Sequence, residues 1–165
     1  MFFNKELIAS LDKKDPAVWL ATWFGCGMTK LAPGTWGTVG GLPFGVAILY
    51  YFGMPALIVA SVIVFAIGYW ASGKFEKMTG KHDDSAIVID EVVGGWIALM
   101  AAGTGLVPVV LAFLLFRFFD ILKPWPVSWA DQKLSGALSV MLDDVLAGIY
   151  AAIVLIGFHY VTSGY

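Results

Sequence analysis

Apolar residues form five long stretches in this chain, separated by short polar or glycine-containing segments. The stretches are residues 38–52, 55–72, 86–102, 106–119 and 137–160. At 1.5 Å per residue the shorter ones reach only about 21–27 Å across a hydrocarbon core roughly 30 Å thick. A sixth stretch, residues 17–28, is shorter still and contains two glycines, which favours an interfacial or re-entrant helix. The pattern predicts an all-α polytopic membrane protein with about five spans, some of them short.

The composition supports lipid as the solvent of this protein. The 165 residues are 59% hydrophobic and 13% charged, whereas soluble domains are about 25% charged. This length predicts a single membrane-embedded domain over residues 1–165, with residues 1–16 as a cytoplasmic N-terminal segment. The formal net charge of −2 provides no basic field, so we expect no nucleic-acid partner. The sequence does not indicate an oligomeric state.

Basic residues mark one end of the predicted spans. All ten lie before the first span, between the second and third, or around the fourth-to-fifth connection: Lys5, Lys13, Lys14, Lys30, Lys74, Lys77, Lys81, Arg117, Lys123 and Lys133. The segments 53–55 and 103–105 and the tail after residue 160 contain none. Lys and Arg near a span favour its cytoplasmic side. An N-in, C-out topology follows, provided that residues 17–28 do not cross.

Two acidic pairs lie near the predicted cytoplasmic starts of spans. Asp90-Glu91 and Asp143-Asp144 are each followed by a glycine four residues after the second acid. An unpartnered carboxylate deep in a spanning helix costs roughly 2.5–3.5 kcal/mol, so four together require a compensating cation. Carboxylate oxygens suit Mg²⁺, and small residues let helices approach closely. We therefore expect all four acids to act as candidate Mg²⁺ ligands; the alternative is that they only complement helix dipoles.

A second candidate segment contains Arg117, Asp120 and Lys123. Arg117 and Asp120 are spaced i, i+3 and share a helix face, and the prolines that follow end the helix. Arg117 can offer a planar fork to phosphate oxygens, while Asp120 either holds that fork or joins the metal. Lys123 adds a point charge. The alternative is ordinary positive-inside charge with one salt bridge.

The segment 33–38 reads as a glycine-bearing turn that leads into a helix. Free backbone N–H groups at Gly34, Thr35, Gly37 and Thr38 could bind phosphate there. The segment lacks the G-K-[ST] ending of a nucleotide-binding P-loop. The alternative is a simple helix start with Thr38 as N-cap.

His82 precedes the helix that carries Asp90. It could relay a proton to a leaving group, although a loop histidine is also commonly just solvated. The chain lacks the motifs of aspartyl-phosphate, cysteine and histidine phosphatases. A covalent mechanism of those types is therefore not expected.

Taken together, these motifs resemble phosphatidylglycerophosphatase A of bacterial phospholipid synthesis. The resemblance rests on PGTWGT at 33–38, SAIVIDEVVG at 85–94, FRFFDILKPWP at 116–126 and LDDVLAG at 142–148. Members often have Ser where this chain has Thr38, which preserves the hydroxyl. The family motif residues carry over to Asp90, Glu91, Arg117, Asp120, Lys123, Asp143 and Asp144.

The resemblance implies Mg²⁺-dependent hydrolysis of phosphatidylglycerophosphate to phosphatidylglycerol and phosphate. It also implies a multi-pass protein of the bacterial inner membrane, with the active site at its cytoplasmic face and a phospholipid substrate in the bilayer. We expect water to attack the phosphate monoester, with an acid that does not bind metal as the base. One rival function is a small ion- or proton-coupled transporter or channel subunit with intramembrane carboxylates. Another is a non-catalytic assembly protein.

Overall fold

In the computed structural model, which describes residues 7, 9 and 11–162, every regular element is helical. The elements are α2 (Pro16–Ala21), the 3₁₀ helix η1 (Cys26–Met28), α3 (Pro33–Thr79), α4 (Ile89–Ala102), α5 (Leu106–Leu122), α6 (Val127–Lys133) and α7 (Ala137–Thr162). The predicted all-α class is confirmed. A large share of the outward surface is apolar, with Tyr51, Phe52 and Val161 each more than 70% exposed. Such a surface suits lipid as solvent, and the protein is a helical membrane protein.

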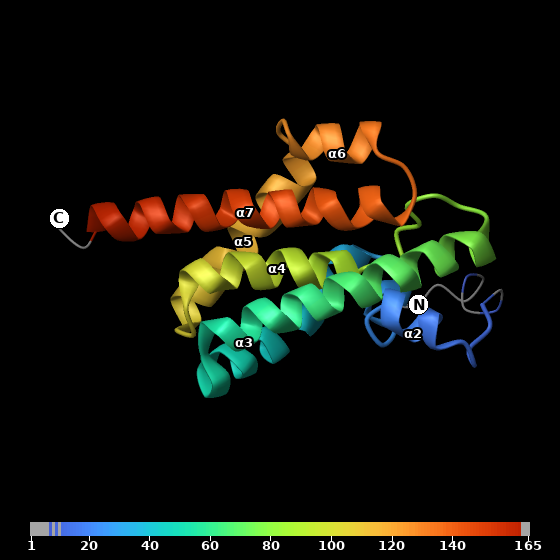
Figure 1. Cartoon of the computed structure of the whole chain (residues 1–165), viewed down its shortest axis with the longest axis horizontal. Coiled ribbons are helices and arrows are strands. Elements are labelled where there is room, and N and C mark those ends of the chain that lie inside the picture. The colour runs from blue at the N-terminus through green and yellow to red at the C-terminus, as the bar shows by residue number, and fades with distance from the viewer. Residues whose placement is uncertain (1–6, 8, 10, 163–165) are drawn as a thin grey trace.

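The helix α3 is bent sharply back on itself at Gly53. This residue has φ 79° and ψ 178°, a backbone conformation that only glycine adopts easily, and Pro55 follows it. The result is two arms, residues 33–52 and 54–79, which both extend from the bend toward the opposite end of the molecule (Figure 1). These arms correspond to the first two predicted spans, and the predicted turn at 53–55 lies at the bend.

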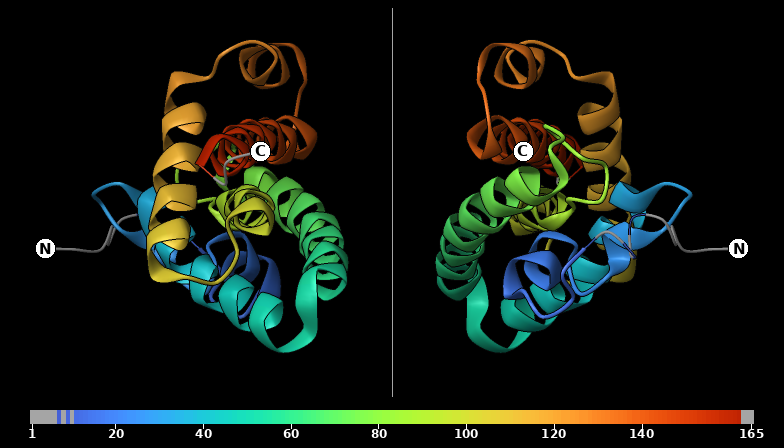
Figure 2. Two further views of the ribbon diagram at one scale, coloured as in Figure 1. Left: turned by 90° about the vertical axis from the view of Figure 1, so that its left-hand side faces the viewer. Right: turned by 90° about the vertical axis from the view of Figure 1, so that its right-hand side faces the viewer.

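The helix α4 lies at the centre of the structure, with α3, α5 and α7 packed around it (Figure 2). Its contact with α7 is very close, because a Cβ added at Gly148 would lie 2.4 Å from the carbonyl oxygen of Gly94. Its contact with the first arm of α3 is fixed by Trp96, whose Nε1 donates to the carbonyl oxygen of Gly41 at 2.9 Å. Glycines thus bring the three helices together near the acidic pairs.

Only α3 and α7 are long and apolar enough to qualify as spans by length and composition within the described residues. The helices α4 and α5 have 14 and 17 residues, so they extend about 21 and 26 Å. Both are shorter than a hydrocarbon core of roughly 30 Å. The helical character of all five predicted stretches is confirmed, and the number that cross the membrane stays a prediction.

Several predicted boundaries are wrong by a few residues. The first arm of α3 begins at Pro33 rather than at residue 38, because proline fits the first helical position, where no N–H is needed. The third stretch becomes helical only at Ile89, since the N–H of Val88 bonds instead to the carbonyl oxygen of Ala21 at 2.8 Å. The short helix α6 was not predicted at all.

The segment 17–28 forms α2, a turn and η1. The six residues of α2 are too few to cross a membrane, and Ala17, Val18 and Ala21 are fully buried. The prediction that this segment does not cross agrees with this geometry.

The two ends of the helical bundle differ in charge. Figure 1 shows the bend in α3, the α4–α5 connection and the C-terminal end of α7 together at the left, and these segments contain no Lys or Arg. The N-terminal ends of α4 and α7 lie toward the other end, as do α2 and the loop between α3 and α4. The acidic pairs therefore lie at the same end as the basic residues that the structure describes.

Candidate active site

A cavity of about 300 Å³ lies where the ends of α3, α4, α5 and α7 meet. We call it the active-site cavity. Its lining includes eight of the residues that the sequence singled out: Gly34, Asp90, Glu91, Arg117, Asp120, Lys123, Asp143 and Asp144. Segments that are up to about a hundred residues apart in the chain thus contribute to one polar site.

Three carboxylates, Asp90, Glu91 and Asp144, form the acidic centre of the cavity. One oxygen from each lies within 4.8 Å of the others, and we call these residues the three-acid cluster. Asp90 and Glu91 occupy the first turn of α4, and the close contact of Gly94 with Gly148 on α7 brings Asp144 beside them. Glu91 Oε2 and Asp144 Oδ2 are buried without a hydrogen-bond partner. Because an unpaired buried carboxylate is costly, this donor set fits a hard divalent cation.

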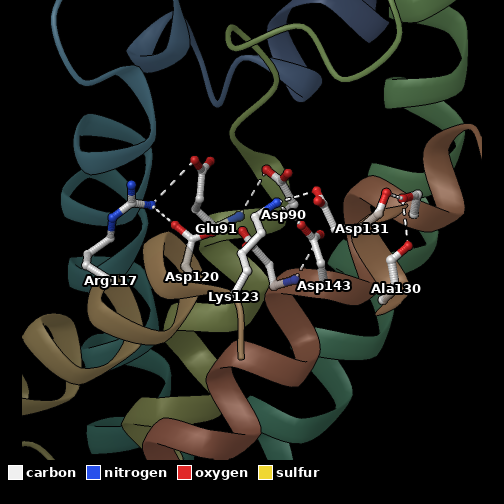
Figure 3. Close-up of polar contacts among 10 residues, drawn as sticks. Asp90, Glu91, Arg117, Asp120, Lys123, Ala130, Asp131 and Asp143 are labelled. Atoms are coloured by element: carbon white, nitrogen blue, oxygen red, sulfur yellow. Dashed lines mark hydrogen bonds and ion pairs between the residues drawn. The ribbon is translucent and has the colours of Figure 1, made fainter. Parts of the chain in front are cut away.

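Arg117 lies beside this cluster at the end of α5. Its Nη1 is 2.7 Å from Asp120 Oδ2 and 3.6 Å from Glu91 Oε1 (Figure 3). A Cβ at Gly34 would lie 2.0 Å from Glu91 Oε1 and 3.1 Å from Arg117 Nη1. A side chain at position 34 would therefore displace the carboxylate of Glu91, whereas glycine leaves it in place beside Arg117.

Lys123 lies on the other side of the cavity, at the C-cap of α5. Its Nζ donates to Asp143 Oδ2 at 2.7 Å and to Asp131 Oδ1 (Figure 3). Burial lowers the pKa of Lys123. The hydrogen bonds to these two carboxylates raise the pKa by more than burial lowers it, so it lies above the usual value. Asp143 thus pairs with a lysine, whereas Asp144 next to it belongs to the three-acid cluster.

The predicted phosphate-binding turn has a different structure from the one expected. Residues 33–38 form the first turns of α3, and Ala32 rather than Thr38 is the N-cap, so the alternative of a Thr38 cap is wrong. Thr38 Oγ1 donates to the carbonyl oxygen of Gly34 at 2.9 Å. Gly37 packs against Val88, since a Cβ there would lie 2.5 Å from the Cβ of Val88. Of the four candidates in this segment, only Gly34 lines the cavity; Thr35 does not.

His82 also lies outside the cavity lining. Its Nδ1 is 2.7 Å from Glu76 Oε1, and the side chain is 53% exposed. No contact of this imidazole with the three-acid cluster is present, so the geometry assigns it no catalytic step.

Sequence reasoning missed three polar residues of the site. Asp83 and Ser85 line the cavity, and Asp131 on α6 holds Lys123. Asp83 directly follows the candidate residue His82, so an acid at this position was a usable signal. No spacing rule connects Asp131 with Lys123, because Asp131 lies within the short helix α6 and a turn precedes that helix.

The sequence profile of the phosphatidylglycerophosphatase A family matches residues 19–159. The chain belongs to this family. A phosphatidylglycerophosphatase A of Haemophilus influenzae is 41% identical over 152 residues, covering 88% of this chain and 90% of that protein. The phosphatidylglycerophosphatase A of Escherichia coli K12 is 36% identical over 163 residues, covering 95% and 93%. No solved structure matches the chain.

A third relative carries a different name. A Bacteroides thetaiotaomicron protein, provisionally named a phosphatidylinositol-3-phosphatase, is 39% identical over 150 residues, covering 84% of this chain and 90% of that protein. All three names are those of phosphatases, and the phosphatidylglycerophosphatase A name denotes a phosphoric monoester hydrolase. Each of the four segments that carry the resemblance to phosphatidylglycerophosphatase A contributes residues to the active-site cavity.

Proposed function

We propose that this protein is a Mg²⁺-dependent lipid phosphatase that hydrolyses phosphatidylglycerophosphate to phosphatidylglycerol and phosphate. Family membership supports phosphatase chemistry on this substrate. The observation that carries the proposal is the three-acid cluster, with two buried unpartnered oxygens, beside the cationic side chains of Arg117 and Lys123.

The charge of the cavity supports a metal requirement. Among the residues that the structure describes, six carboxylates line it against two cationic side chains: Asp83, Asp90, Glu91, Asp120, Asp143 and Asp144 against Arg117 and Lys123. A phosphate monoester dianion would be repelled from so negative a cavity, and a divalent cation reverses that local balance.

The three-acid cluster would hold this cation through Asp90, Glu91 and Asp144. Mg²⁺ typically binds a few carboxylates together with waters and phosphate oxygens. When bound, it would polarise a phosphoryl oxygen and lower the pKa of water. Asp143 is already paired with Lys123, so we assign it to the lysine rather than to the metal.

The remaining side chains orient the phosphate and handle the proton. Asp120 fixes Arg117, whose guanidinium donates to phosphoryl oxygens and stabilises the charge that develops in the transition state. Lys123, held in place by its two carboxylates, provides a second positive charge. Asp120 and Asp143 line the cavity outside the three-acid cluster. One of them accepts the proton of the attacking water and returns a proton to the glycerol oxygen as the P–O bond to that oxygen breaks.

The placement of charge favours an active site at the cytoplasmic face of the bacterial inner membrane. The cavity lies at the end of the bundle that carries the basic residues, which is the cytoplasmic end by the positive-inside rule. In a multi-pass arrangement, the acyl chains of the substrate can stay in the bilayer while the headgroup enters the cavity. A transporter would need carboxylates near the middle of the membrane, so we do not pursue that rival.

The test is phosphate release from phosphatidylglycerophosphate by the purified protein in detergent, with Mg²⁺ or with EDTA. We expect native activity only with Mg²⁺, and almost none for Asp90→Asn. Asp12→Asn, at an exposed acid outside the cavity, is the matched control and should retain activity. Activity that survived both chelation and Asp90→Asn would overturn the proposed metal site.

Substrate choice needs a separate comparison, because the provisional name of the Bacteroides relative refers to another lipid phosphate. Phosphatidylglycerophosphate, phosphatidylinositol 3-phosphate and phosphatidic acid should be compared by kcat/KM under identical conditions. We expect phosphatidylglycerophosphate to be preferred. A preference for either of the other lipids would support phosphatase activity but contradict the proposed substrate.

A further inference from the structure

A second and larger cavity, of about 750 Å³, lies between the second arm of α3 and the start of α7. It shares no lining residue with the active-site cavity. The loop after α3 separates the two, since Lys81 and His82 line the larger cavity while Asp83 and Ser85 line the active-site cavity. The proposed phosphatase reaction does not use this larger cavity, which we call the basic cavity.

Three lysines give the basic cavity its charge. Lys74, Lys77 and Lys81 line it, and Glu76 is the only acid among the described residues of the lining. Glu76 is already engaged, because its Oε1 lies 2.7 Å from His82 Nδ1 and accepts from the N–H of Asp83 at 2.9 Å. The cavity therefore offers more positive charge than its own lining neutralises.

Neighbouring acids pair with two of these lysines but not with the third. Lys74 Nζ lies 2.6 Å from Asp15 Oδ2, and Lys81 Nζ is 3.9 Å from Asp84 Oδ2, a long contact. Lys77 has no ion-pair partner among the described residues. The ammonium group of Lys77 is thus available to an incoming anion.

The start of α7 adds to the attraction for an anion. Gly136 and Ala137 line the basic cavity, and the 26-residue helix has no acidic residue in its first turn. The N-terminal N–H groups and the dipole of a helix favour negative charge, and the start of this helix lines the same cavity as the lysines.

The surroundings of the cavity suit a lipid. Tyr69 and Trp70 line it and are 51% and 48% exposed, and Lys74 Nζ lies 5.6 Å above the ring of Trp70. Aromatic residues of this kind favour the headgroup level of a membrane. One to two turns farther toward the bend in α3, Val62 and Ile63 are also exposed, 64% and 52%. An acyl chain could lie along this face of the second arm below a headgroup bound by the lysines.

We propose that the basic cavity binds the phosphodiester headgroup of an anionic phospholipid, as a second lipid site separate from the active-site cavity. Phosphate is the group recognised, and it could come from a lipid or from free inorganic phosphate. The exposed aromatic and aliphatic residues that continue from the lysines along α3 favour the lipid source.

The test is native mass spectrometry of the delipidated protein titrated with phosphatidylserine, an anionic phosphodiester lipid that is not the product of the proposed reaction. Phosphatidylcholine, which has no net charge, serves as the lipid control. The variant Lys77→Gln/Lys81→Gln is compared with Lys30→Gln/Lys133→Gln, which changes the net charge equally at exposed lysines outside the cavity. We expect roughly 30-fold weaker phosphatidylserine binding for the first variant only, since each lysine near a membrane surface contributes about a fivefold effect.

A second variant tests whether the lipid binds in the basic cavity, without changing any charge. Gly73 lines the cavity, and a Cβ there would lie 3.5 Å from the Cβ of Ala137, an ordinary contact. Gly73→Leu should therefore fill the space between α3 and α7 and also weaken phosphatidylserine binding. Circular dichroism of each variant checks that the helices are intact.

Three outcomes would overturn the proposal. Equal loss of binding in both lysine double variants would indicate general surface charge. Unchanged binding in Lys77→Gln/Lys81→Gln, or in a folded Gly73→Leu protein, would remove the cavity as the site. Displacement of phosphatidylserine by millimolar inorganic phosphate would assign the site to free phosphate instead of lipid.

Discussion

The active-site cavity and the basic cavity lie on opposite sides of one loop, and they hold their charges in different ways. In the active-site cavity, Asp90 and Asp144 are only 7% and 3% exposed and are fixed by helices that touch through glycines. In the basic cavity, Lys77 lies on α3 and Lys81 lies in the loop that follows it, and both side chains are exposed. A buried charge needs a partner in one definite place, whereas an exposed charge is solvated without one. Substitutions should therefore have large effects in the first cavity and modest effects in the second.

The largest effect is expected at the two neighbouring acids of α7. Asp144 has a buried unpartnered oxygen in the three-acid cluster, whereas Asp143 is paired with Lys123. Asp144→Asn should lower kcat about a thousandfold, because a metal contributes several kcal/mol to the transition state. It should also raise the Mg²⁺ concentration needed for half-maximal activity. Steady-state phosphate release over a Mg²⁺ titration measures both quantities.

Asp143→Asn is the matched variant in this experiment. It should lower activity but raise the Mg²⁺ requirement less than Asp144→Asn does, because the partner of Asp143 is Lys123. If Asp143→Asn shifted the Mg²⁺ requirement more than Asp144→Asn, the assignment of the two acids would have to be exchanged.

Arg117→Lys should have the next largest effect. Arg117 is the only arginine of the chain, and lysine keeps the charge but loses the planar fork that can hold Asp120 and a phosphoryl oxygen together. We expect kcat/KM to fall about 100-fold, as for loss of one oriented donor to a developing oxyanion. Lys133→Arg, on α6, is the control and should change little. A near-native Arg117→Lys enzyme would show that charge alone is sufficient.

The glycine contact between α4 and α7 predicts an effect on stability. Gly148→Ala would place a Cβ 2.4 Å from the carbonyl oxygen of Gly94, so the backbones must separate. We expect the free energy of unfolding to fall by about 1–3 kcal/mol, with lower activity because Asp144 is one turn away. Thermal unfolding in detergent, followed by circular dichroism, measures the loss.

Gly157→Ala is the matched control on the same helix. A Cβ there meets nothing within 4 Å, and alanine favours helix over glycine by up to about 1 kcal/mol. This variant should be neutral or slightly stabilising. Equal melting temperatures for the two variants would mean that the close contact does not limit stability.

The difference between the cavities also explains what could be predicted from the sequence. The acidic pairs stood out because buried carboxylates are costly in so apolar a chain, and each pair was followed by a glycine. The structure brings Asp90, Glu91 and Asp144 together where Gly148 contacts Gly94, whereas the expected α4 glycine, Gly95, lies against Thr38 instead. The bend at Gly53 was predictable for a similar reason, because a glycine and a proline interrupt a long apolar run.

Features that depend on tertiary contacts were not predictable. The side chain of Asp143 turns to Lys123, and nothing in the local sequence distinguishes it from Asp144. The start of α3 at Pro33 was missed because the segment was read as a glycine turn. His82 was predicted to be a possible proton relay, but its imidazole contacts Glu76, six residues earlier, and no local pattern indicated that pairing.

The smallest effect is expected at Asp131, which lies between the two extremes of burial. Lys123 and Asp131 have side chains 29% and 28% exposed, and Lys123 keeps Asp143 as a partner when Asp131 is changed. Because partly exposed ion pairs contribute at most about 1 kcal/mol, Asp131→Asn should lower kcat/KM by no more than about fivefold. The loss should appear mainly in KM, since Lys123 would be held less firmly for the phosphate while the three-acid cluster is unchanged. Phosphate-release kinetics of Asp131→Asn, with Asp12→Asn as the control, measure kcat and KM. A loss of about 100-fold in kcat would instead mean that Asp131 acts on the reacting groups, and that the active site extends onto α6.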